Sequence, residues 1–113
     1  MNDLEVVKGF LIQLIQDKKG DFESGEWEAD YDLNWGSEFS ERIDRGFYNV
    51  AKAIAARKSK DDVMLKVALL NARVDFMDLA NFFRDIYDDI DALLKDTSWP
   101  EVPEGFDYEQ EIK

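Results

Sequence analysis

The stretch that decides the fold runs from Ser59 to Lys95 and reads SKDDVMLKVALLNARVDFMDLANFFRDIYDDIDALLK. Its apolar residues recur in alternating steps of four and three, a spacing that keeps them on one face of an α-helix. At the usual 3.6 residues per turn, the stretch predicts a helix of about ten turns. This first stripe consists of Leu65, Leu69, Ala72, Phe76, Leu79, Phe83, Ile86, Ile90 and Leu93.

A second apolar stripe follows the other side of the same predicted helix and ends at Met77. A helix that is apolar nearly all round is expected to be covered on both sides, whereas a one-sided helix turns its polar half to water. We therefore expect burial on both sides up to Met77 and an acidic, solvated face from Asp78 onward. The second stripe consists of Val63, Val67, Leu70, Val74 and Met77.

Two further helices are predicted nearer the N-terminus. Asn2 or Asp3 can cap the first, which is expected to end at Gly20 because glycine suits a left-handed cap. Ser37 is expected to open the second, which ends near Lys58 and lies antiparallel to the long helix because the turn between them is short. The three helices predict an all-α fold, a small helical bundle. The core stripe of the second helix consists of Phe39, Ile43, Phe47, Val50, Ala51 and Ile54.

Residues 21–36 form an acidic arm between the first two helices, and the sequence leaves its backbone open. Aromatic and apolar residues alternate with acids, which is the period of a half-buried strand. Trp27, Tyr31 and Trp35 are also four residues apart, which is helical spacing. Because only the short stretch from Asp21 to Glu23 is available for pairing, we expect an irregular or short-strand arm whose aromatic side chains pin it to the helices.

A chain of 113 residues is expected to form one domain. We place a single helical domain at residues 1–100, because Pro100 disfavours a helix at the residue before it. Residues 101–113 contain five acids and the two spacers Pro103 and Gly105, and we expect them to form an acidic C-terminal tail.

The net charge of the chain excludes several function classes. Twenty-six acidic residues against fourteen basic ones give a net charge of -12, and there is no histidine and no cysteine. Such a balance repels nucleic acid and anionic membranes and favours a basic partner. Without a histidine base or a cysteine thiol, we expect no enzyme activity and no cofactor.

The first residues are acidic where a secretory signal is basic, and no apolar run is long enough to cross a bilayer, so we expect a cytoplasmic protein.

Two acidic patterns are candidates for a metal site. Residues 30–41 place Asp, Asp, Asn and Glu at positions one, three, five and twelve of an EF-hand calcium loop, but Trp35 stands where glycine is needed. Asp78, Asp85 and Asp89 share one side of the long helix, but the paired glutamate motifs of metal sites in helical bundles are missing. Calcium or magnesium binding is therefore the weakest functional hypothesis, and no metal site is predicted.

The leading functional hypothesis takes the charge itself as the function. Carboxylates spaced like backbone phosphates can occupy a protein surface built for DNA or RNA, and aromatic residues among them supply anchors. In composition the chain resembles the small acidic inhibitors among nuclease-toxin immunity proteins and phage anti-defence proteins. The resemblance implies a non-enzymatic inhibitor, a nucleic-acid mimic that blocks a nuclease or another basic nucleic-acid-binding protein. The residues predicted to contact this partner are Glu26, Trp27, Glu28, Asp30, Tyr31, Asp32, Trp35, Asp78, Asp85, Asp88 and Asp89.

The alternative hypothesis is a helical structural or assembly module, such as a homodimer. Its motivation is the second apolar stripe, because three helices are too few to cover it fully. The two hypotheses differ in solution, since the assembly module forms oligomers at micromolar concentration whereas the inhibitor needs only its partner.

Overall fold

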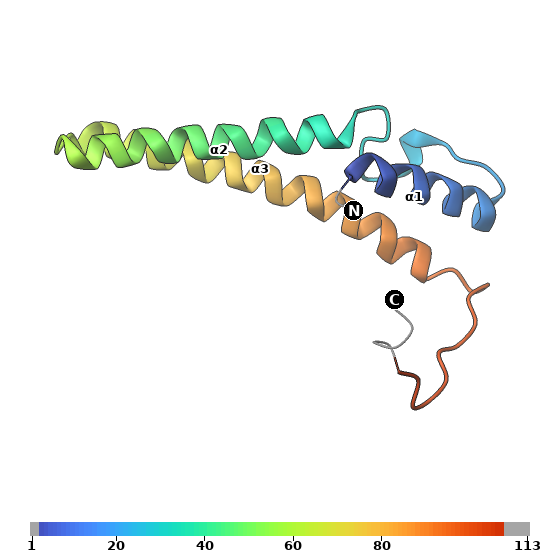
Figure 1. Cartoon of the computed structure of the whole chain (residues 1–113). Helices are drawn as coiled ribbons and strands as arrows, with labels where there is room; N and C mark the ends of the chain where they lie inside the picture. The colour runs from blue at the N-terminus through green and yellow to red at the C-terminus, as the bar shows by residue number, and fades with distance from the viewer. Residues whose placement is uncertain (1–2, 108–113) are drawn as a thin grey trace.

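The computed structural model describes residues 3–107, and within them the chain forms three α-helices and one short 3₁₀ helix (Figure 1). The helix α1 spans Leu4–Lys19, α2 spans Trp35–Lys58 and α3 spans Asp62–Leu94, while the 3₁₀ helix η1 spans Ser24–Glu26. Residues 3–107 contain no β-strand, so the all-α prediction is confirmed and the short-strand alternative for residues 21–36 is wrong.

The helices α2 and α3 form a long antiparallel hairpin that determines the shape of the molecule (Figure 1). The reversal takes only residues 59–61, and Lys60 has a φ of 57°. Asp61 then caps α3, because its side chain accepts a hydrogen bond from Met64 N at 3.0 Å. The radius of gyration is 19.5 Å, whereas a compact domain of this length has about 13 Å. The molecule is therefore elongated.

Small residues bring the two helices of the hairpin close together. Gly46 and Ala53 of α2 and Ala68 and Ala72 of α3 are buried. A Cβ atom added at Gly46 would lie 2.9 Å from the ring of Phe76. Helices approach most closely where their contact residues are small. The α2–α3 contact is therefore made largely by glycine and alanine, and the larger apolar side chains are left at its borders.

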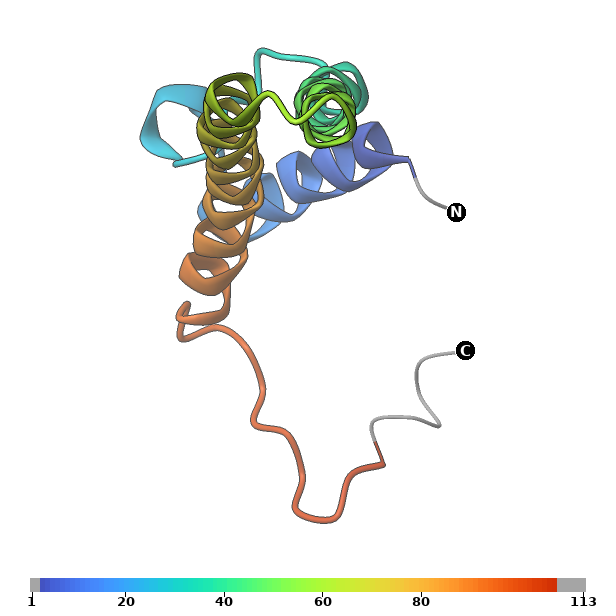
Figure 2. The same ribbon diagram turned by 90° about the vertical axis from the view of Figure 1, so that its left-hand side faces the viewer.

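The prediction that the long helix is buried on both sides up to Met77 is wrong. Val63 of the second stripe is 77% exposed and Met77 is 58% exposed. Phe47 and Ile54, which we expected in the core stripe of α2, are also exposed. The physical reason is visible in Figures 1 and 2, where α1 packs at the far end of the hairpin and no third helix reaches its tip.

The hydrophobic core lies at the other end, where α1 packs against the beginning of α2 and the second half of α3 (Figure 2). Trp35 is only 1% exposed and starts α2, two residues before the expected Ser37. The start moves because the side chain of Asn34 accepts a hydrogen bond from Ser37 N at 2.9 Å and so acts as the N-cap. The buried members of this core are Leu11, Ile15, Ala29, Tyr31, Trp35, Ile86 and Leu93.

The ends of α1 and α3 are joined by the segment that follows α3. Lys19 pairs with Asp96 at 3.1 Å, and the Lys18 ammonium lies 3.8 Å from the centre of the Trp99 ring. Trp99 Nε1 donates a hydrogen bond to the Leu93 carbonyl at 2.7 Å. These contacts extend the packed structure to residue 99, and residues 101–107 are exposed. The part of the expected tail at residues 108–113 lies outside the described residues.

Replacing Ala68 with leucine tests the close α2–α3 packing. Ala68 is fully buried, so three extra carbons cannot fit without moving α2, and we expect Ala68→Leu to lower the free energy of unfolding by about 1–3 kcal/mol. Urea denaturation measures this change. Ala80→Leu makes the same substitution at an exposed position of α3 and serves as the control. Equal stability of the two variants would contradict close packing.

The stability of the protein should fall at acidic pH partly through Asp96. Hydrogen bonds from the side chain and backbone of Ser98 and from Lys19 hold the pKa of Asp96 well below its ordinary value of 3.8. A depressed pKa contributes stability above pH 3.8, and this contribution is lost as the pH falls through the lower value of the folded state. We therefore expect Asp96→Asn to flatten the decrease of the melting temperature between about pH 4 and pH 2. Asp17→Asn, at an exposed position of α1, should leave the slope unchanged.

Candidate protein-binding site

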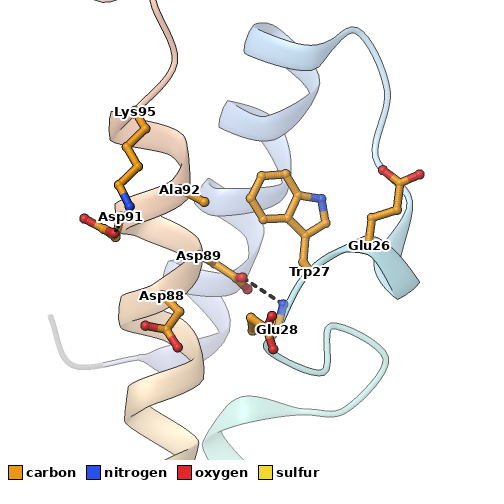
Figure 3. A pocket seen from close by; sticks show the side chains of 8 residues that line it. All are labelled: Glu26, Trp27, Glu28, Asp88, Asp89, Asp91, Ala92 and Lys95. Carbon is orange, nitrogen blue, oxygen red and sulfur yellow. Dashed lines mark hydrogen bonds and ion pairs between the residues drawn. The ribbon is translucent and has the colours of Figure 1, made fainter.

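A buried carboxylate joins α3 to the segment between α1 and α2. Asp89 is 1% exposed. Its two oxygens accept a hydrogen bond from Glu28 N at 2.8 Å (Figure 3), and further ones from Ala29 N at 3.0 Å and from the Tyr31 hydroxyl at 2.9 Å. Three donors compensate much of the cost of removing a carboxylate from water. Asp89 therefore holds the connecting segment in place. The prediction that Asp89 contacts a partner is wrong, because its side chain is buried.

Tyr31 and Trp35 are also structural rather than accessible. Tyr31 is 5% exposed, and its ring contacts those of Phe22 and Trp35 at centroid distances of 5.1 and 5.2 Å. Burial and the neighbouring Asp89 carboxylate raise the pKa of Tyr31 above its usual range. The expectation that aromatic side chains pin the acidic segment to the helices is confirmed, but the predicted partner contacts of Tyr31 and Trp35 are wrong because both side chains are buried.

Trp35 is further fixed through its nitrogen atoms. Its indole Nε1 donates to the Asp30 carbonyl at 2.9 Å, and its backbone N donates to the carboxylate of Glu5 at 2.7 Å. The hydrogen bond from Trp35 N and the interaction with Lys8 lower the pKa of Glu5. The first turn of α1 thereby contacts the first turn of α2, and the segment between them is held at both ends.

The remaining predicted residues of the segment surround a hollow of about 430 Å³ at the end of the molecule (Figure 3). The hollow lies between the segment and the last turns of α3. Trp27 is half-buried and its indole ring forms one wall, while Glu26 and Glu28 are exposed. The lining residues are Glu26, Trp27, Glu28, Asp88, Asp89, Asp91, Ala92 and Lys95.

Trp27 and Glu28 also line a second, smaller hollow of about 270 Å³ that is formed by the segment alone. This second hollow includes the exposed Asp30 and Asp32. The Asp30 side chain accepts a hydrogen bond from Asp32 N at 3.0 Å, which shapes the turn. Trp27 is therefore shared by two hollows that carboxylates line. We call this region, made of residues 24–32 with Asp88 and Asp91, the acidic end.

Three residues that line the larger hollow, Asp91, Ala92 and Lys95, were not among the predicted partner contacts. Lys95 pairs with Asp91 at 3.0 Å, and hydrogen bonding to Asp91 raises the pKa of Lys95. Spacing by three and four places Asp88, Asp91 and Lys95 on one side of a helix, so this part of the wall could have been found. The contribution of Trp27 opposite them depends on the Asp89 contact and has no sequence signal.

The acids on the middle of α3 lie elsewhere. Asp78 is 11 residues before Asp89, which is about 16 Å along a helix. Its carboxylate pairs with Arg42 and Arg45 of α2 at 3.3 Å each, so it links the two helices of the hairpin. Asp85 is partly buried one turn before Asp89. The structure therefore separates Asp78 from the acidic end, while Asp88 belongs to it and pairs with Arg84 at 3.7 Å.

Neither metal pattern of the sequence becomes a metal site in the described part of the chain. Residues 3–107 contain no group of three or more Asp or Glu side chains placed to hold an ion. Asn34, one of the expected calcium ligands, instead caps α2. None of the helices in residues 3–107 is long and apolar enough to cross a bilayer.

Comparison with known proteins supports the fold and is silent on function. No protein-family model matches the chain, and no curated protein matches it. A crystal structure described as that of a functionally unknown protein from Neisseria meningitidis MC58 superposes with a TM-score of 0.72 and 23% sequence identity. The match covers 88% of this chain and 98% of the other. At this identity the likeness shows a shared fold.

Replacing Asp89 with asparagine tests the role of the buried carboxylate. Asparagine keeps the shape but has a single acceptor oxygen, so at least one of the hydrogen bonds from Glu28 N, Ala29 N and Tyr31 is lost. We expect Asp89→Asn to lower the free energy of unfolding by about 3 kcal/mol. Asp88→Asn, the matched control on a half-exposed neighbour, should cost less than about 0.5 kcal/mol. Urea denaturation of both variants measures the difference, and equal stability would contradict a structural role of Asp89.

Proposed function

We propose that this protein is a non-enzymatic inhibitor that binds a basic, nucleic-acid-handling protein through its acidic end. The observation that carries the proposal is that Trp27 lines two hollows that carboxylates also line. A half-buried aromatic ring beside acids is suited to a cationic side chain, because the ring face and the carboxylates both attract positive charge.

The charges of the chain are also segregated along the hairpin, which supports the acidic end as the contact region. Residues 46–77 carry six basic and three acidic residues, a net charge of +3. Since the whole chain carries -12, the rest of it carries -15. The field that steers a basic protein is therefore strongest near the acidic end and is weak or opposite in sign at the tip of the hairpin.

The larger hollow offers a specific place for one arginine or lysine of the partner. A guanidinium or ammonium group in it would lie against Trp27 and between Glu26, Glu28 and Asp88. Cation–π contact with tryptophan contributes roughly 0.5–2 kcal/mol, the larger value when the cation is desolvated. Lys95 already pairs with Asp91 and Arg84 with Asp88, so the carboxylates of Glu26 and Glu28 are the ones left to receive the partner.

Rigid placement of these carboxylates favours tight, inhibitory binding over weak, non-specific electrostatic association. The Asp89 hydrogen bonds fix the backbone at Glu28 and Ala29, next to Trp27. A preorganised surface loses less conformational entropy on binding than a mobile acidic tail does. Such a surface can occupy the nucleic-acid site of a nuclease or other DNA- or RNA-binding protein, in the manner of an immunity or anti-defence protein, and it would compete with nucleic acid for that site.

The experiment that tests the proposal combines capture with inhibition. The tagged chain is used to capture proteins at low and high salt, and the captured nuclease or nucleic-acid-binding protein is purified. Addition of the chain should block its cleavage or binding of nucleic acid. The triple variant Glu28→Gln, Asp30→Asn, Asp32→Asn should slow association about tenfold and flatten its dependence on salt, because electrostatic steering acts mainly on the association rate.

The matched control removes the same three charges elsewhere. Asp17→Asn, Glu41→Gln and Glu104→Gln are exposed positions away from the acidic end. This control should retain inhibition and most of the association rate. If the triple variant at residues 28–32 inhibits as fast as the control, or if the captured protein keeps its activity with the chain bound, the proposal is wrong.

A further inference from the structure

The tip of the hairpin leaves a large apolar surface uncovered. Because small residues fill the α2–α3 contact, most of the large apolar side chains in residues 46–77 remain exposed. Figure 2 looks onto this tip, where α2 and α3 lie side by side with no other element over them. The exposed apolar residues there are Phe47, Tyr48, Ile54, Val63, Met64, Val67, Leu69, Leu70, Val74, Phe76 and Met77.

Part of this surface forms one continuous face shared by both helices. Phe47 and Ile54 of α2 are seven residues apart, and so are Leu69, Phe76 and Phe83 of α3. A seven-residue repeat keeps a seam of side chains on one side of a helix, as in coiled coils and four-helix bundles. We call these five residues the hairpin face.

Two contacts show that the seams of the two helices meet on the same flank. The rings of Phe39 and Phe83 lie 5.7 Å apart. Phe39 begins the α2 stripe that continues through Ile43 and Phe47. The ring of Phe76 lies over Gly46, the neighbour of Phe47. The hairpin therefore presents two adjacent heptad seams on one side, which is half of a four-helix bundle.

The exposed area of the hairpin face supplies more than half of what one partner in a standard interface buries. Its five side chains are 38–61% exposed, and large side chains offer on the order of 200 Å² each, so the face presents roughly 500 Å² of apolar surface. Monomers rarely expose larger apolar patches, and each partner in a standard interface buries about 800 Å². The partly buried Ile43, Val50 and Leu65 between these residues extend the area further.

We infer that the occupant of the hairpin face is a second copy of this chain, packed antiparallel to form a four-helix bundle. The charge segregation selects this occupant and this orientation. The tip carries +3 and the remainder -15, so a parallel pair would place two basic tips together. An antiparallel pair places each basic tip beside the acidic half of the other copy. Two-fold symmetry, in which both copies use the same surface, is also the usual arrangement of a homodimer.

Most charges that border the face near the tip are basic, and the acidic exception is Asp62. Lys66 and Arg73 each precede a face residue by three positions, and Lys58 follows Ile54 by four, so all three border the face near the tip. Asp44 precedes Phe47 by three positions and borders it toward the other end. A shallow groove of about 390 Å³ between Leu69, Lys66 and Arg73 offers room for a side chain of the second copy.

Sedimentation equilibrium of the full chain at about 1–100 µM tests the inference, since micromolar association is within reach of an interface of this size. We expect a particle of twice the 13.2 kDa chain mass. Phe47→Glu and Leu69→Glu should each raise the dissociation constant at least tenfold, because each buries an unpaired charge in the interface. Val67→Glu is the matched control, since Val67 is exposed on the opposite side of α3. Circular dichroism verifies that each variant is folded.

The orientation has its own test. Ser59→Cys introduces a thiol at the tip of a chain that has no cysteine. The antiparallel dimer should remain uncrosslinked under mild oxidation, and Lys66→Glu with Arg73→Glu should weaken it. A monomer throughout the concentration range, a dimer lost with Val67→Glu but not with Leu69→Glu, or rapid disulfide formation at residue 59 would overturn the inference. Because the residues altered to test inhibition lie outside the hairpin face, either proposal can fail without the other.

Discussion

The buried carboxylate of Asp89 is the interaction on which the base of this molecule depends. It lies on α3, and it accepts hydrogen bonds from the backbone at Glu28 and Ala29 and from the hydroxyl of Tyr31. A connecting segment rich in acids would otherwise be repelled from the acidic half of α3. The three hydrogen bonds hold it there, and this placement lets Tyr31 fill the core and leaves Trp27 at the surface between carboxylates.

The two ends of the hairpin have opposite physical properties for a reason that lies in helix packing. At the base, α1 and the connecting segment supply the third side of a core, so Leu11, Ile15 and Leu93 are buried. At the tip, no other element within residues 3–107 packs on α2 and α3, and the contact between these two helices uses alanine and glycine. The base is acidic and suits a basic protein, while the tip is weakly basic and apolar and suits a second copy of the chain. One chain can thus present two separate surfaces for two kinds of contact.

The sequence predicted the helices better than it predicted which elements pack against them. Spacing by three and four identified α3 and the stripe on α2, and Asp3 and Gly20 marked the ends of α1, because these signals are local. Burial of the second stripe was expected and is absent, since stripe width does not reveal how far a neighbouring helix reaches. Asp89 looked like the other acids of α3, because a carboxylate that accepts backbone hydrogen bonds from residues about 60 positions away leaves no local pattern. The acidic end was predicted in part, and the inward direction of Tyr31 and Trp35 was not.

The most direct test of this account is the amide hydrogen exchange of Glu28 and Ala29 in the unmodified protein, followed by NMR. Both amides belong to an irregular segment, where exposed backbone exchanges nearly as fast as in an unfolded chain. If Asp89 holds the segment on α3, both should be protected to an extent similar to amides in the middle of α3. Exchange of Glu28 and Ala29 at the rate of the exposed turn at Asp32, with α3 still protected, would show that the segment is not held by Asp89 and would contradict the account.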